Sequence, residues 1–126
     1  FIKSDLFNKC NGFDEQFFVY YEEVDLSKRI NDLGLKSFFL ADCYAYHVGG
    51  GVSQQVKAQR LFYSLRSRIL YSKKHFNFLS YFLIYFLSLF VEPISRIAFS
   101  LLKLEFKAIY ETISAYKLLF KWTFQR

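Results

Sequence analysis

The segment at positions 17–34 reads FFVYYEEVDLSKRINDLG and combines an aromatic run, an acidic cluster and a helical repeat. The aromatic and β-branched run at 17–21 predicts a short strand or a buried loop. From Glu22 onward the apolar positions recur at i, i+4 and i+7, which places them on one helix face: Leu26, Ile30 and Leu33. Gly34 predicts the end of that helix, because glycine readily adopts the left-handed conformation that follows a last helical turn.

Extended segments are expected on the C-terminal side of this helix. Residues 36–41 predict a short strand, and residues 44–47 predict a second extended piece. A strand, a helix and a strand within 50 residues are typical of an α/β fold class. The sequence therefore predicts one edge of an α/β domain, without enough strands for a complete sheet.

Charge divides the 126 residues into two parts. Residues 1–50 carry five Lys/Arg and eight Asp/Glu, a net charge of −3, whereas residues 51–126 carry twelve and three, a net charge of +9. We therefore expect an α/β part at 1–54 and a helical tail at 55–126. The 53% hydrophobic content excludes a disordered chain, and two cysteines exclude a disulfide scaffold. The absence of Met leads us to expect a piece of a longer chain.

Three carboxylates lie close together after the aromatic run: Glu22, Glu23 and Asp25. Mutual repulsion and nearby apolar rings are expected to raise their pKa values, as in a general base or a cation site. The alternative is a solvated helix start, where the helix dipole favours acids. Asp25 and Arg29 are four residues apart and are expected to pair on the helix.

His47 precedes three glycines, which allow the backbone to approach a ligand closely. A single histidine is more often a packed or surface residue than a metal ligand. The cysteines and histidines do not have the paired spacing of a zinc site: Cys10, Cys43, His47 and His75. Both cysteines are expected to stay reduced in a cytosolic setting.

These features form an ordered series that is similar to one known family. The series begins with residues 1–7 and Asn11-Gly12-Phe13-Asp14-Glu15. It continues with the aromatic run and Glu22-Glu23-Val24-Asp25-Leu26, then Arg29, Gly34, and His47 followed by Gly50 and Ser53. It resembles the C-terminal part of the catalytic domain of family 2 glycosyltransferases, in particular the rhamnosyltransferase-like members that build cell-surface polysaccharide. The resemblance covers about residues 1–75.

The resemblance implies a GT-A fold and an inverting sugar transfer from a nucleoside-diphosphate sugar to an acceptor hydroxyl. It places the general base on Glu23, beside Glu22 and Asp25, and a ligand for a divalent Mg or Mn ion on His47. Residues on the binding side are implied as well: Gly12, Phe13, Asp14 and Arg29. We take Asp25 and Arg29 mainly as scaffold, because of their i, i+4 spacing.

The chain departs from the family pattern in three respects. Glu23 stands where the family usually has Asp, so the carboxylate has a longer stem. Asn11-Gly12 replaces the usual Gly-Gly, and asparagine also tolerates a left-handed backbone. The Asp-x-Asp motif that holds the metal in the family occurs nowhere in the 126 residues. We therefore expect that this piece alone neither binds the donor nor turns over substrate.

The tail alternates between basic and apolar segments. Residues 55–74 predict a basic helix with an apolar face formed by Leu61, Leu65 and Ile69. Residues 76–91 carry no charge, but these sixteen residues fall short of the ~20 that a spanning helix needs. Glu92-Pro93 is expected to break the run. A second apolar stripe follows at i, i+4, i+7 and i+11: Ile109, Ile113, Tyr116 and Phe120.

Three interpretations of the tail stay open at this point. It forms helices lying in the membrane interface, a marginal transmembrane helix, or a bundle packed on another domain or subunit. The interfacial interpretation predicts a peripheral enzyme on the cytoplasmic face of the bacterial inner membrane, acting on a saccharide or lipid-linked acceptor. The alternative function is a non-enzymatic, membrane-interacting helical protein. Nucleic-acid binding is not expected, because the basic residues lie on helices with apolar stripes.

Overall fold

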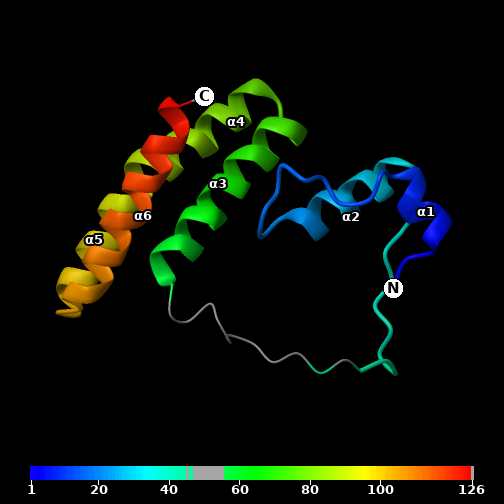
Figure 1. Ribbon diagram of the computed structural model, residues 1–126, viewed down its shortest axis with the longest axis horizontal. Helices are drawn as coiled ribbons and strands as arrows, with labels where there is room; N and C mark the ends of the chain where they lie inside the picture. Colours follow the sequence, from blue (N-terminus) through cyan, green and yellow to red (C-terminus); the bar gives the residue numbers. More distant parts are fainter. Residues whose placement is uncertain (45, 47–55, 126) are drawn as a thin grey trace.

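The computed structural model describes residues 1–44, 46 and 56–125, and these residues form helices connected by loops (Figure 1). The helical elements follow one another in chain order: α1 (Ser4–Lys9), α2 (Glu22–Asp32), α3 (Lys57–His75), α4 (Phe78–Phe86), the π-helical segment η2 (Leu87–Val91), α5 (Glu92–Leu102) and α6 (Phe106–Phe124). No strand occurs within the described ranges. The expected α/β fold class is therefore wrong, and the described part of the chain is all-α.

The segments expected to be strands form loops because no neighbouring strand pairs with them. Residues 36–40 have no regular secondary structure, and Phe38 and Phe39 are exposed to solvent. An isolated strand leaves its backbone donors and acceptors unpaired, so propensity alone does not hold it in place. The aromatic run at 17–21 forms a series of bends in which Phe17 is buried, as the loop alternative predicted. Half of the second extended piece, positions 45 and 47, lies outside the described residues.

The predicted helix after the acidic cluster is confirmed. Helix α2 begins at Glu22, buries Leu26 and ends before Gly34, whose φ of +78° is the left-handed conformation expected after a last turn. The backbone N–H of Gly34 donates to the Asn31 carbonyl at 2.9 Å. These features depend only on neighbouring residues, which is why the local pattern predicts them.

The C-terminal part is a three-helix bundle (Figure 1). Helix α3, the long helix formed by α4, η2 and α5, and helix α6 pack side by side, each antiparallel to the preceding one. The buried core is made of five side chains: Leu65, Ile69, Leu89, Tyr116 and Leu119. The predicted apolar face of α3 is thus confirmed, since Leu65 and Ile69 are buried and Leu61 packs against them.

Glu92 and Pro93 interrupt the charge-free run but do not end the helix, because α4, η2 and α5 run on as one helix from Phe78 to Leu102. Proline lacks the N–H that an α-helix needs and collides with the preceding turn. The wider π turn of η2 lies immediately before Pro93 and accommodates this interruption. The resulting 25-residue helix is long and apolar enough to cross a membrane.

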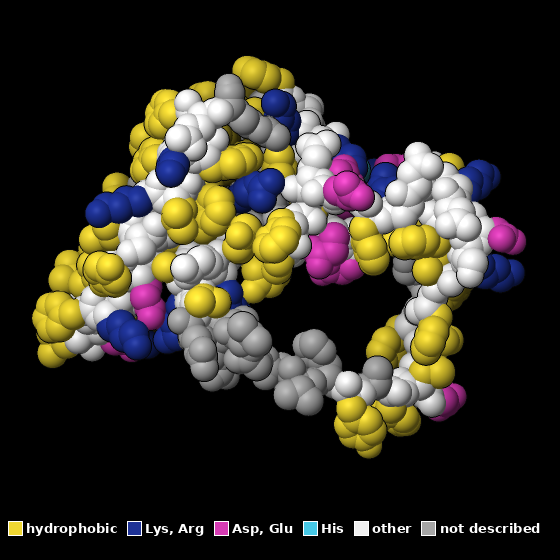
Figure 2. Space-filling model, viewed as in Figure 1, with side chains coloured by type: hydrophobic (Ala, Val, Ile, Leu, Met, Phe, Trp, Pro, Cys, Tyr) yellow, Lys and Arg dark blue, Asp and Glu magenta, His cyan; other side chains and the backbone are white. Residues whose placement is uncertain are grey.

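The stripe predicted on α6 is only partly correct. Its buried face consists of Thr112, Ala115, Tyr116 and Leu119, so Tyr116 is the one member of the predicted stripe that is buried. Ile113 and Phe120 are exposed instead. The bundle leaves many hydrophobic side chains uncovered, and Figure 2 shows them over the outer surface of α5 and α6. A period-3.6 pattern identifies an apolar face but does not identify what covers it.

Candidate functional site

Asp25 is the centre of a buried ionic network. Its side chain is 0% exposed and lies in the first turn of α2. Oδ2 accepts a hydrogen bond from Arg29 Nε at 2.8 Å, so the predicted i, i+4 pair is present. Oδ1 lies 2.7 Å from Lys74 Nζ and 2.7 Å from His75 Nε2, both at the end of α3. One buried carboxylate therefore joins α2 to the three-helix bundle.

The turn at residues 11–14 is attached to this network through Arg29 and Lys74. Arg29 Nη2 donates to the carbonyl of Gly12 at 2.7 Å, and Nη1 donates to the carbonyl of Cys10. Lys74 Nζ bonds Asp14 Oδ2 at 2.5 Å as well as Asp25. Three of the residues implied on the binding side, Gly12, Asp14 and Arg29, are therefore brought together around Asp25.

Gly12 is required at its position in the turn. Its φ is +63°, a region that non-glycine residues rarely adopt. A Cβ added there would lie 3.1 Å from Cζ of Phe7, so the ring of Phe7 would have to move. Phe13, the remaining residue of this set, is exposed and packs edge-to-face on Phe7 with ring centroids 5.5 Å apart.

The network keeps Asp25 ionised. Burial raises the pKa of this carboxyl, but hydrogen bonds from Lys74, His75 and Arg29 outweigh burial and hold the pKa below its usual range. The expected rise of its pKa is therefore wrong, because the hydrogen bonds from three neighbouring groups outweigh the burial that would raise it. A carboxylate this stabilised is a poor proton acceptor, which favours a positioning role for Asp25.

The other two acids of the cluster have different surroundings. Glu23 is exposed in the first turn of α2, where a side chain can reach a ligand in solvent. Glu22 is half-buried, and its Oε2 is enclosed without a hydrogen-bond partner among the described residues. Both follow Tyr20 and Tyr21, which have φ angles of 66° and 72°. Consecutive left-handed tyrosines are costly, and such strain often occurs at functional sites.

The structure does not test the implied divalent metal, because the expected ligand lies outside the described residues. No group of three or more His, Cys, Asp or Glu side chains that could hold a metal ion occurs among them. His47, the proposed ligand, lies outside the described residues, as do Gly50 and Ser53.

The sequence did not identify Lys74 and His75 as members of the site. The spacing of cysteines and histidines excludes His75 from a zinc set, and the charge pattern places Lys74 on a basic helix. The available signal was charge complementarity between an acidic helix start and the end of α3, which carries Lys73, Lys74 and His75. This signal does not specify a contact across 50 residues of sequence, because that contact depends on how the chain folds back.

Comparison with known proteins supplies no relative: no family model, curated protein or solved structure matches the chain. The resemblance to family 2 glycosyltransferases therefore rests on the motif series alone.

Proposed function

We propose that the chain is the acceptor-side part of an inverting family 2 glycosyltransferase that acts in cell-surface polysaccharide or lipopolysaccharide biosynthesis. The observation that carries this proposal is the Asp25 network. The network holds three residues around one buried carboxylate: Gly12, Asp14 and Arg29. The resemblance implies these residues from their order in the sequence alone. Glu23 extends from the same helical turn into solvent.

In this proposal Glu23 is the general base. Its carboxylate takes the proton from the acceptor hydroxyl while that oxygen attacks the anomeric carbon of the donor sugar. The bond between the anomeric carbon and the diphosphate oxygen breaks, and its electron pair leaves with the nucleoside diphosphate. Asp25, Arg29 and Lys74 fix the helix that carries Glu23 and the turn at 11–14, so that the base is positioned before substrate binds.

Donor binding in this proposal is supplied by protein outside these 126 residues, because the chain contains no Asp-x-Asp. The test is a titration of the full-length protein with a panel of nucleoside-diphosphate sugars in the presence of Mg²⁺ or Mn²⁺. We expect saturable binding of one donor and transfer of its sugar to an acceptor. A folded full-length protein that binds no donor would contradict the proposal and favour the non-enzymatic alternative.

We further propose that the three-helix bundle lies in the membrane interface on the cytoplasmic face of the bacterial inner membrane. The helix from Phe78 to Leu102 can cross a membrane by length and composition, and only 11% of its most apolar stretch is buried. However, Glu92 lies within it, bonded to Arg68 at 2.6 Å and to Arg96 at 2.7 Å. Three ionic side chains deep in hydrocarbon are costly, whereas at the interface they reach headgroups and water.

The outer face of the long helix is expected to carry membrane binding. Phe82, Phe86 and Phe90 are exposed at successive i, i+4 positions. Replacing all three by Ser is expected to weaken binding to phospholipid vesicles at least ~10-fold, because each inserted ring contributes on the order of 1 kcal/mol. Co-sedimentation with vesicles measures the change.

The matched control replaces two exposed phenylalanines outside the bundle, Phe38 and Phe39, by Ser. This double variant is expected to bind vesicles as the wild type does. An equal loss of vesicle binding in both variants would indicate non-specific hydrophobic binding by exposed rings and would contradict an interfacial bundle.

A further inference from the structure

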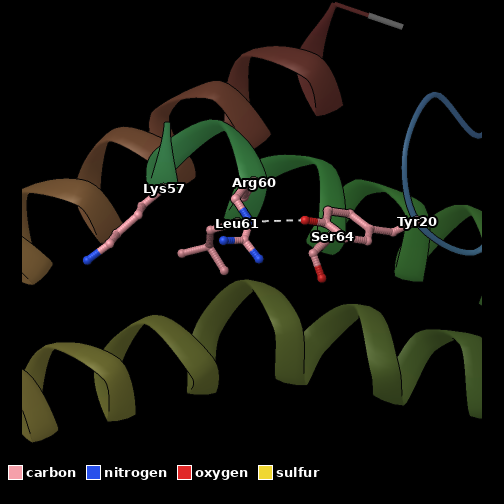
Figure 3. A pocket seen from close by; sticks show the side chains of 5 residues that line it. All are labelled: Tyr20, Lys57, Arg60, Leu61 and Ser64. Atoms are coloured by element: carbon pink, nitrogen blue, oxygen red, sulfur yellow. Dashed lines mark hydrogen bonds between the residues drawn. The ribbon is translucent and has the colours of Figure 1, made fainter. Parts of the chain in front are cut away.

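A second polar site lies where the aromatic loop meets the start of α3. Five residues line a cavity of about 320 Å³ there: Tyr20, Lys57, Arg60, Leu61 and Ser64. Figure 3 shows the Arg60 guanidinium, the Tyr20 hydroxyl and Ser64 close together, while Lys57 extends farther along α3. We propose that this cavity binds a phosphate-bearing group, and the inference is independent of the transferase activity.

The hydrogen bond between Arg60 and Tyr20 leaves several donors available. Arg60 Nε donates to Tyr20 Oη at 3.1 Å, so this bond uses one edge of the guanidinium. The two terminal amino groups have no partner among the described residues and can form a bidentate pair with an oxyanion. Because Tyr20 Oη accepts this bond, its own proton remains available to a ligand. The Ser64 hydroxyl adds another donor to the cavity wall.

The charged side chains that line the cavity, Lys57 and Arg60, are both positive. Neither Lys57 nor Arg60 belongs to an ion pair within the described part of the chain. Both lie at the start of α3, whose first turn contains no acidic residue, so their charges add to the positive end of the helix dipole. Glu105 and Glu111 line a separate cavity that shares Lys57, which makes Arg60 the principal anchor.

The Tyr20 ring lines the cavity beside Arg60 and Ser64, so its hydroxyl faces the same space as the guanidinium (Figure 3). A guanidinium fork with two hydroxyls suits a tetrahedral anion with several acceptor oxygens. A nucleobase would require a stacking surface, and the lining offers Leu61 and the Tyr20 ring only. The ligand class is therefore a phosphate or diphosphate ester, either free or in a lipid headgroup.

The experiment titrates the full-length protein with inorganic diphosphate by calorimetry and measures co-sedimentation with vesicles of neutral lipid alone or with phosphatidic acid. We expect Arg60→Gln to weaken diphosphate binding ~10-fold, and Arg60→Lys to have a smaller effect because it keeps the charge but loses the fork. Tyr20→Phe removes only a hydroxyl and should weaken binding ~3-fold. The matched control is Lys117→Gln, an exposed lysine on α6, which should leave binding unchanged.

The two sources of phosphate give different results. If Arg60→Gln weakens binding in both assays, the site recognises the phosphate group itself. If it weakens binding to phosphatidic acid vesicles alone, the site recognises a lipid headgroup. Wild-type affinity of folded Arg60→Gln for both probes would overturn the proposal. An equal loss in Lys117→Gln would also overturn it, because binding would then follow net charge rather than the cavity.

Discussion

Replacement of Asp25 by asparagine is expected to lower the free energy of unfolding by about 3–5 kcal/mol. Asparagine has nearly the same shape, so the loss reports charge rather than volume. The carboxylate is fully buried, and without it Arg29, Lys74 and His75 face a neutral amide. Urea denaturation of the wild type and the variant, followed by circular dichroism, measures the difference.

The matched control is Asp32→Asn at the other end of α2. Asp32 pairs with Lys28 at the i, i+4 spacing, and both side chains are exposed. Exposed pairs contribute little, so a loss of less than ~0.5 kcal/mol is expected. If Asp25→Asn costs no more than this control, Asp25 is not the anchor that joins α2 to the bundle.

Asp25→Asn is also expected to change the dependence of the free energy of unfolding on pH. The pKa of Asp25 is lower in the folded protein than the usual ~3.9 of an unfolded chain. Its carboxylate therefore stabilises the fold fully above the unfolded pKa, and this contribution is lost as the pH falls through the folded pKa. The wild type should lose more stability than Asp25→Asn between about pH 6 and pH 2. Parallel curves for the two proteins would contradict the low pKa of Asp25.

The pKa of Lys74 is shifted in the opposite direction to that of Asp25. Burial lowers its pKa, but bonds to Asp14 and Asp25 outweigh burial and raise the pKa above its usual value. The ammonium group therefore contributes its full stability below the unfolded pKa of ~10.4 and loses it as the pH rises through the folded value. The network is thus expected to hold α2 on the bundle throughout the neutral range.

The sequence predicts those features whose interacting residues lie close together along the chain. The start of α2, the Asp25–Arg29 pair and the turn at Gly34 each depend on residues within a few positions, and all three are present. The strand predicted at 36–41 did not form, because a strand needs a partner that no local pattern supplies. The helix continues past Pro93 because the π turn before it accommodates the ring, and composition does not report such a turn.

The candidate site shows the same division. The turn at 11–14 and the acidic cluster were identified from residue order. Residue order does not identify Lys74 and His75, although their contacts make Asp25 an ionised, buried anchor rather than one of several surface acids. Their sequence separation from Asp25 is about fifty residues, and only the packing of α3 against the loop and α2 brings them there, as in the bond from Ser67 Oγ to the Val19 carbonyl at 2.8 Å.

Under the proposal that Glu23 is the general base of a glycosyltransferase, converting it to glutamine in the full-length protein is expected to reduce sugar transfer by about 10²–10⁴-fold, the usual contribution of such a base. Glutamine keeps the size of the side chain but cannot accept the proton of the acceptor hydroxyl. Since Glu23 is exposed and makes no ion pair within the described part of the chain, folding should be unchanged. Initial rates measured at saturating donor, together with thermal unfolding, separate loss of chemistry from loss of structure.

Two further variants make this prediction specific. Glu22→Gln alters the neighbouring acid, whose Oε2 is enclosed and cannot reach a substrate through that atom, and it should retain most of the rate. Glu23→Asp keeps the carboxylate on a stem shorter by one methylene, so partial activity is expected if the base must reach the acceptor hydroxyl within hydrogen-bond distance. Wild-type rates in Glu23→Gln would reject Glu23 as the base. A loss in Glu22→Gln with full activity in Glu23→Gln would move that role to the half-buried neighbour.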